Sequence, residues 1–301
     1  MSMTVAIFQD TGWCIGEMYR NIAPHIEGVC FEWSKVYDKQ VFDSFDRVLT
    51  LAGDGSKCLV KQYGIPRDKI LVVAHDTQDV IRLFGNDGNE GIRQYAGFGV
   101  VSDTMAAETL AIGVTRIPTV LRGGVDCGFY DSAIPPALRR VGYASTYSRT
   151  NEYGVERKRG DLARKAAVQA GLEFTTAIGP INNRFSGIPK GKMPDYYRSV
   201  DAVIMSSLEE GGGMPMLEGA AAGRLTIGTP VGEFPRLAYE GLGILAPLGE
   251  EAFVEFVAGQ LIQYKQDPMS FQSKCRSIQA AARKRDWSCV ISDWIRFVGA
   301  E

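Results

Sequence analysis

The sequence predicts an α/β protein made of two doubly wound domains, each built on a parallel β-sheet. Short apolar runs rich in β-favouring residues alternate with helical patterns along most of the chain, with short loops between them. Such alternation is typical of parallel strands joined by crossover helices. The length of 301 residues favours two domains over one. A Pro-Pro pair at 135–136, in a segment without periodicity, predicts the connection between them.

Six apolar runs in the first half are expected to be strands: residues 4–8, 29–33, 47–51, 70–74, 97–101 and 118–121. Helices are expected between several of them, at residues 56–63, 77–83 and 102–112. Ser102 or Asp103 would cap the last of these helices, and Gly113 would end it. Residues 1–133 are therefore assigned to an N-terminal Rossmann-like domain.

The alternation restarts after the Pro-Pro segment. Five further strands are expected, at residues 140–144, 172–178, 202–205, 225–227 and 243–245. Their helices are expected at residues 161–170, 194–198, 215–222 and 252–264. Residues 138–285 are assigned on this pattern to a C-terminal Rossmann-like domain.

The end of the chain carries a strongly amphipathic helical pattern with two tryptophans on its apolar face. The residues of that face are Trp287, Val290, Ile291, Trp294, Phe297 and Val298. Such a helix could finish the C-terminal domain, or it could cross back to the N-terminal one. We predict the second arrangement for residues 286–301.

The amino-acid composition of the chain argues against several classes of protein function. A formal net charge of −2 lacks the basic surplus of a nucleic-acid-binding protein. No apolar run approaches the roughly 20 residues of a membrane helix, so at most peripheral membrane contact is expected. The six cysteines are scattered without a Cys-x-x-Cys pair, and the first residues enter a strand-like run without a signal-peptide pattern. These features predict a cytoplasmic protein. With only two histidines, His25 and His75, no metal site is expected.

Residues 202–223 join a buried strand, a loop with three consecutive glycines and a helix that has Pro215 in its first turn. Free backbone amides and the positive end of the helix make this junction suitable for a diphosphate. Glu218, one turn into the helix, could accept the two hydroxyls of a ribose, and Glu210 could accept from sugar hydroxyls. An ordinary glycine-rich βα turn is the alternative if the loop is taken alone.

The same segment resembles the Glu-x7-Glu signature of family 4 retaining glycosyltransferases (glycosyl transferases group 1), with its Ser-x-x-Glu-Gly entry at 207–211. Residues 193–201 are similar to the preceding helix of that family, and 221–237 to its next strand and turn. Looser similarities occur at residues 70–76, 121–126, 141–143 and 158–161, and at Trp287. The resemblance implies the GT-B architecture: two Rossmann-like domains facing a cleft, the first on the acceptor side, with a C-terminal helix that crosses back.

The resemblance also implies a role for each matching residue. Glu218 would bind the nucleotide ribose and Glu210 the donor sugar, and His75 would contact the sugar near the reacting carbon. A hydrogen-bonded structural histidine at a strand end is the alternative for His75. The donor loop and helix start would meet the diphosphate and sugar through Gly211, Gly212, Gly213, Met214 and Pro215.

This chain departs from the family pattern at the basic residues. The usual arginine after the first strand of the second domain is replaced by Ala144-Ser145. Arg149, Lys158 and Arg159, with Arg157, lie nearby and could neutralise the leaving diphosphate, or they could form a surface charge run. Gly12 and Gly16 fall in a predicted loop after the first strand, expected to face the cleft. This loop lacks the G-x-G-x-x-G spacing of dinucleotide-binding dehydrogenases.

The resemblance implies a retaining transfer of a hexosyl group from a UDP- or GDP-linked sugar to a hydroxyl of a glycan, lipid-linked or small-molecule acceptor. No Asp-x-Asp occurs in the sequence, so a metal-independent mechanism without a bound cofactor is expected. Two alternatives stay open. One is a sugar-nucleotide epimerase or phosphorylase of the same fold, and the other is a catalytically weakened sugar-nucleotide-binding protein.

Overall fold

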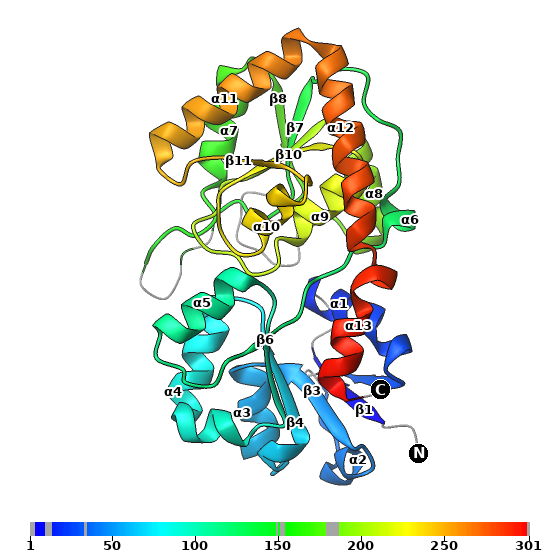
Figure 1. Cartoon of the computed structure of the whole chain (residues 1–301), viewed down its shortest axis with the longest axis vertical. Coiled ribbons are helices and arrows are strands. Elements are labelled where there is room, and N and C mark those ends of the chain that lie inside the picture. Colours follow the sequence, from blue (N-terminus) through cyan, green and yellow to red (C-terminus); the bar gives the residue numbers. More distant parts are fainter. Residues whose placement is uncertain are drawn as a thin grey trace. The chain divides into compact units, whose positions relative to one another are not determined.

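The computed structural model describes residues 4–9, 14–32, 35–148, 150, 154–178 and 187–299. The chain divides into two compact units, Met1–Gly124 with Trp287–Glu301, and Val125–Asp286. Each unit has one parallel sheet with helices on both faces and its own apolar core, so the predicted fold class is confirmed (Figure 1). No helix in the described part of the chain has the length and apolar character needed to cross a bilayer.

The first unit contains a six-stranded sheet in the order β2-β1-β3-β4-β5-β6, and every neighbouring pair is parallel. All six predicted runs form strands. They are β1 (Val5–Phe8), β2 (Gly28–Phe31), β3 (Arg47–Leu51), β4 (Ile70–Ala74), β5 (Gly97–Val100) and β6 (Thr119–Val120). The apolar side chains of β1 and β4, and Val48 and Leu49 of β3, are almost fully buried, as expected for strands covered on both faces.

Helices cover both faces of this sheet. They are α1 (Cys14–Ile22), α2 (Lys39–Asp43), α3 (Asp54–Lys61), α4 (Thr77–Gln94), α5 (Asp103–Ala111) and α13 (Trp287–Val298). Helices α3, α4 and α5 pack in sequence on one face, and α1 packs with α13 on the other (Figure 1). The change of face follows from the strand order, because the chain leaves β1 towards β2 and then returns to β3 on the other side of β1.

Two predictions about these helices are corrected. Helix α1 begins at Cys14, so Gly16 is a buried helical residue and does not belong to the predicted loop. Helix α4 continues to Gln94, well beyond the predicted end at residue 83. Beyond residue 83 the helix contains three glycines and several polar residues, which lower helix propensity, and Gly88 has a positive φ of 59° where the helix kinks. Packing against neighbouring elements overrides this weak local preference.

The second unit has a five-stranded parallel sheet in the order β11-β10-β9-β7-β8. The strands are β7 (Arg140–Tyr143), β8 (Glu173–Thr176), β9 (Ala202–Met205), β10 (Leu225–Gly228) and β11 (Ile244–Leu245). The helices are α6 (Cys127–Tyr130), α7 (Gly160–Gln169), α8 (Met193–Arg198), α9 (Met214–Ala221), α10 (Phe234–Tyr239), α11 (Glu250–Gln266) and α12 (Pro268–Ala282). Helix α11 packs on α7, and α12 packs on α9 (Figure 1). Helix α12 was not expected, because its buried stripe includes only two large apolar side chains, Phe271 and Ile278.

The boundary between the units lies at Gly124, earlier than the predicted boundary at residue 133. The amide of Val125 donates to the carbonyl of Arg285 at 2.9 Å. Val125, Tyr130 and Leu138 are buried in the core of the second unit. The Pro-Pro segment is therefore part of the second unit, and its lack of periodicity reflects an irregular stretch of chain that packs on that core.

The terminal helix α13 belongs to the first unit, as predicted. Trp287, Val290, Ile291, Trp294 and Val298 are buried in the core of that unit. The Trp294 indole N–H donates to the carbonyl of Arg122 at 2.9 Å. A side chain at Gly124 would collide with the ring of Trp287, which gives that glycine a packing role.

Candidate functional site

The loop that connects β9 to α9 ends with residues 210–213, which are called the donor loop below. Gly213 precedes the helix with a left-handed φ of 59°, and apart from its own chain neighbours no heavy atom of the described residues lies within 4 Å of the place a Cβ would take. Pro215 occupies the second helical position. Among the described residues, no protein acceptor receives the amides of Gly212, Gly213 or Met214. Free amides at the positive end of a helix form a site for an anion such as a phosphate.

The carboxylate of Glu210 lies at one end of this loop beside a lysine ammonium. Its Oε1 accepts hydrogen bonds from Lys158 Nζ and, at 2.7 Å, from Ser207 Oγ. The side chain of Lys158 is only 10% exposed, and that of Glu210 only 16%. A charge-assisted hydrogen bond at a site with so little solvent exposure is stronger than one in bulk water. The fold therefore brings together two predicted site residues that lie far apart in sequence.

The backbone that carries Lys158 is held from three sides. Tyr143 OH donates to the Lys158 carbonyl at 2.6 Å, and Ser206 Oγ donates to the Arg159 carbonyl at 2.7 Å. The Lys158 amide donates to Glu156 Oε1 at 2.8 Å. Arg159 has a left-handed φ of 49°, which is unfavourable for a side chain of this type. These bonds hold the turn in place and direct the lysine to Glu210.

The other basic residues of this segment have partners of their own. Arg159 donates from Nε to the Ser206 carbonyl at 2.7 Å and from Nη1 to the Leu248 carbonyl at 2.9 Å. Burial lowers the pKa of Arg159. Arg157 pairs with Glu209 at 3.1 Å. Arg157, Lys158 and Arg159 are all at most 8% exposed, so the surface charge run considered from the sequence is wrong. Arg149 lies outside the described residues.

Glu218 lies on α9 and is 6% exposed. Lys190 Nζ donates to its Oε1 at 2.7 Å, and Tyr197 OH donates to its Oε2 at 2.8 Å. Lys190 also lies over the ring of Tyr130, 5.3 Å from its centroid. Burial, followed by the charge of Glu218, raises the pKa of Tyr197 well above its ordinary value. Sequence reasoning missed Lys190 and Tyr197, although both lie in or beside the 193–201 segment that carries the family resemblance.

The sheet topology explains why these residues meet. The chain leaves β7 towards β8 on one side and later returns to β9 on the other side of β7. Ligands of open α/β sheets bind outside the carboxyl ends of the strands, at such a switch point. Lys158 follows β7, and Glu210 and the donor loop follow β9. Both therefore belong to the segments that leave the switch point.

His75 lies in the first unit, directly after β4, where Asp76 caps α4. Tyr19 OH lies 3.0 Å from His75 Nε2, and the ring of Tyr19 packs edge-on against Trp294. Among the described residues, Nδ1 has no hydrogen-bond partner. Burial lowers the pKa of His75 to about 3, so the imidazole is neutral at pH 7. Gly12 lies outside the described residues, and Gly16 is placed in α1.

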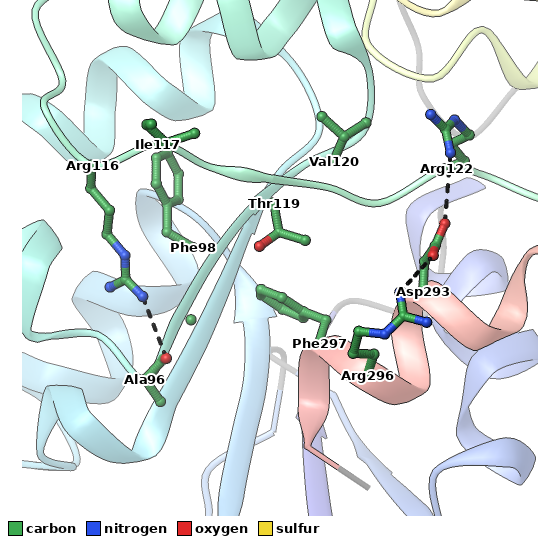
Figure 2. A pocket seen from close by; sticks show the side chains of 11 residues that line it. Ala96, Phe98, Arg116, Ile117, Thr119, Val120, Arg122, Asp293, Arg296 and Phe297 are labelled. Atoms are coloured by element: carbon green, nitrogen blue, oxygen red, sulfur yellow. Dashed lines mark hydrogen bonds and ion pairs between the residues drawn. The ribbon is translucent and has the colours of Figure 1, made fainter. Parts of the chain in front are cut away.

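A cavity of about 480 Å³ lies elsewhere in the first unit, between β5, β6 and α13 (Figure 2). Its arginines already have partners. Arg116 donates to backbone carbonyls including Tyr95 at 2.7 Å, and Asp293 lies between Arg122 and Arg296. The residues that line this cavity include none of the predicted site residues. No cluster of His, Cys, Asp or Glu that could hold a metal ion occurs among the residues that the structure describes.

Residues 154–262 match the family model described as Glycosyl transferases group 1. No curated protein matches the chain in sequence. Anabaena HepE in complex with UDP and glucose is similar in structure over 99% of this chain and 100% of its own, with a TM-score of 0.71 and 15% identity. Sucrose-phosphate synthase from Thermosynechococcus elongatus matches 98% of this chain and 98% of its own, with a TM-score of 0.74 and 12% identity.

The pneumococcal O-GlcNAc transferase GtfA, crystallised with UDP and GlcNAc, has a TM-score of 0.59 and 15% identity. It matches over 86% of this chain and 58% of its own length. These findings confirm the resemblance to glycosyl transferases group 1 and the GT-B fold that it implied. The family match begins after β7, extends through β8 to β11 into α11, and includes Lys158, Glu210 and Glu218.

Proposed function

We propose that this chain, whose second unit matches glycosyl transferases group 1, is a glycosyltransferase that uses a UDP- or GDP-linked hexose. It transfers the hexosyl group to an acceptor hydroxyl, keeps the anomeric configuration and needs no metal ion. One observation carries this proposal: the amides of Gly212, Gly213 and Met214, which no acceptor among the described residues receives, lie in sequence between two carboxylates with little solvent exposure, Glu210 and Glu218.

The two carboxylates suit two different parts of the donor. Glu218 accepts from Lys190 and Tyr197, and each of its oxygens keeps a further lone pair that can accept a ribose hydroxyl. Glu210, in the loop that follows β9, is assigned to the hydroxyls of the transferred sugar. The amides of Gly212, Gly213 and Met214 lie between them in sequence and are assigned to the diphosphate.

The reaction breaks the bond between the anomeric carbon and the diphosphate oxygen and forms a bond to the acceptor oxygen. The departing diphosphate takes up the acceptor proton on the face from which it leaves. Its growing negative charge would be stabilised by the free amides, the positive end of α9 and the ammonium of Lys158. Lys158 thus takes the place of the arginine that the family has near residue 145, while Arg159 supports the fold through Ser206 and Leu248.

His75 is assigned to a hydroxyl of the sugar near the reacting carbon. A neutral imidazole offers a hydrogen bond but no charge, and its Nε2 is already engaged with Tyr19. Product formation from a sugar nucleotide distinguishes this proposal from the two alternatives, an epimerase or phosphorylase and a binding protein.

The test separates the two glutamates. Glu218→Ala should weaken binding of bare UDP or GDP roughly ten- to a hundredfold, because a hydrogen bond to a charged group contributes about 1.5–3 kcal/mol. Glu210→Ala should leave bare-nucleotide affinity nearly intact and lower turnover of the sugar nucleotide. Glu251→Ala, at the exposed start of α11, is the matched control and should change neither.

Calorimetry with the nucleotide and steady-state kinetics with the sugar nucleotide measure both effects. Equal losses of nucleotide affinity in the two variants would show that the roles are wrongly divided. Unchanged affinity and turnover in both variants would place the donor site elsewhere.

A further inference from the structure

The turn that joins β10 to α10 lies directly against the donor loop. Gly232 has a positive φ of 57°, and a Cβ at this position would collide with the carbonyl oxygens of Glu210 and Gly211. The amide of the next residue, Glu233, donates to the Gly211 carbonyl at 2.8 Å. The backbone of the donor loop therefore rests on residues 232–233, with no space between them.

The side chain of Glu233 is directed away from this contact into the interior, where it meets an arginine. Arg285 Nη2 lies 2.8 Å from Glu233 Oε1, and the two side chains are 3% and 1% exposed, respectively. Arg285 Nε also lies 2.7 Å from Glu240 Oε2, which is 25% exposed and also pairs with Arg236. A buried ion pair contributes little net stability, but it fixes geometry because either charge alone would be costly.

Arg285 is itself fixed by its backbone. Its carbonyl accepts the amide of Val125 at 2.9 Å, and the neighbouring Asp286 accepts the amide of Cys127 at 3.1 Å through Oδ2. These two hydrogen bonds join residues 125–127 to residues 285–286 within the second unit, and they fix the backbone position of Arg285. From this fixed backbone the Arg285 guanidinium extends to Glu233, in the 232–233 turn that contacts the donor loop.

We propose that Glu233 and Arg285 are positioning residues for the diphosphate part of the donor site. The pair holds the 232–233 turn, which sets the Gly211 carbonyl and with it the orientation of the Gly212, Gly213 and Met214 amides. Amides that stabilise a developing charge must be aimed in advance, so a small shift of this turn weakens diphosphate binding. This inference rests on the proposed function and names the support of that same site.

The experiment compares two carboxylates that share one arginine. Glu233→Gln removes the charge that contacts Arg285 beside the donor loop, while Glu240→Gln removes the charge on the other side and does not touch the loop. Binding of UDP and of UMP is measured by calorimetry, with GDP and GMP if the wild type prefers guanine. Glu233→Gln should lower UDP affinity at least tenfold and UMP affinity less than threefold. Glu240→Gln should change each less than twofold.

The difference between diphosphate and monophosphate is the readout that a merely structural role would not produce. Equal losses for UDP and UMP, or equal losses in both variants, would overturn the proposal. If Glu233→Gln does not fold, the double variant Glu233→Met/Arg285→Met replaces the pair with apolar side chains of similar size. It should still show a loss of at least about threefold in the UDP-to-UMP affinity ratio, and a wild-type ratio would overturn the inference. A wild type that binds neither UDP nor GDP would instead defeat the proposed function itself.

Discussion

At the scale of single residues, each charged group of the candidate site is held by a named partner. Glu218 is held by Lys190 and Tyr197, and Glu210 by Lys158 and Ser207. These contacts remove the rotamer freedom that a bound ligand would otherwise have to restrict, so both carboxylates are preorganised. The histidine of the first unit is held in the same manner by Tyr19.

His75 should make stability depend on pH in a predictable direction. The unfolded chain takes up the His75 proton near pH 6.5, whereas the folded protein takes it up only near pH 3, because burial disfavours the charged ring. The free energy of unfolding therefore falls as the pH is lowered from about 6.5 towards 3, by at most about 1.4 kcal/mol per pH unit. His75→Gln keeps a polar group beside Tyr19 and should lose this dependence.

Denaturant unfolding of the wild type and His75→Gln at pH 7.5 and pH 4.5 measures the effect. Burial and the charge of Asp76 raise the pKa of Asp79 to about 7, which gives a pH dependence of opposite sign. Since Asp79 is present in both proteins, the difference between them reports His75. Parallel losses of stability in the two proteins would contradict the prediction.

At the scale of elements, α13 supports the sheet of the first unit and also the candidate histidine. Trp294 is fully buried, and Tyr19 lies between it and His75. Phe297 fills the space above Gly97 and Gly99 of β5, where a Cβ would meet its ring. The helix is distant in sequence from every strand that it covers.

Removal of α13 should unfold the first unit. A chain that ends at Asp286 would expose the surface that two tryptophans, Val290, Ile291 and Val298 now cover. Full burial of one large apolar side chain contributes about 1.5–3 kcal/mol, and a typical domain is stable by only about 5–15 kcal/mol. A chain ending at Gly299 is the control and should melt like the wild type.

The milder variant Trp294→Ala should cost about 3–5 kcal/mol, because it leaves a large cavity in the core. Circular dichroism melting and denaturant titration measure both changes. Unchanged melting of the chain that ends at Asp286 would show that α13 does not contribute to the stability of the first unit.

At the scale of the whole molecule, the charge of the leaving group is assigned to protein groups. Among the described residues of the second unit, the proposed groups for this role are the amides of the donor loop and the start of α9 and the ammonium of Lys158. Exhaustive treatment with EDTA should therefore leave turnover of the sugar nucleotide essentially unchanged. The prediction is motivated by the absence of Asp-x-Asp from the sequence. A loss of turnover that Mn²⁺ or Mg²⁺ restores would contradict it.

The sequence by itself determined the fold class, the eleven strands, the donor loop and the apolar face of the terminal helix. These are local features, because a strand, a glycine-rich turn and an amphipathic stripe are each written in consecutive residues. It did not determine where α4 ends, since three glycines between residues 84 and 94 lower helix propensity and only packing compensates for it.

Only the tertiary structure decided which basic residue meets which acid. Arg157, Lys158 and Arg159 are adjacent in sequence, yet one pairs with Glu209, one with Glu210 and one with backbone carbonyls. The partners of Lys190 and Arg285, Glu218 and Glu233, lie 28 and 52 positions away. Such pairings depend on strand order and on burial, which bring distant segments to the same sheet edge and remove water between them. No pattern of consecutive residues indicates the strand order or which side chains become buried together.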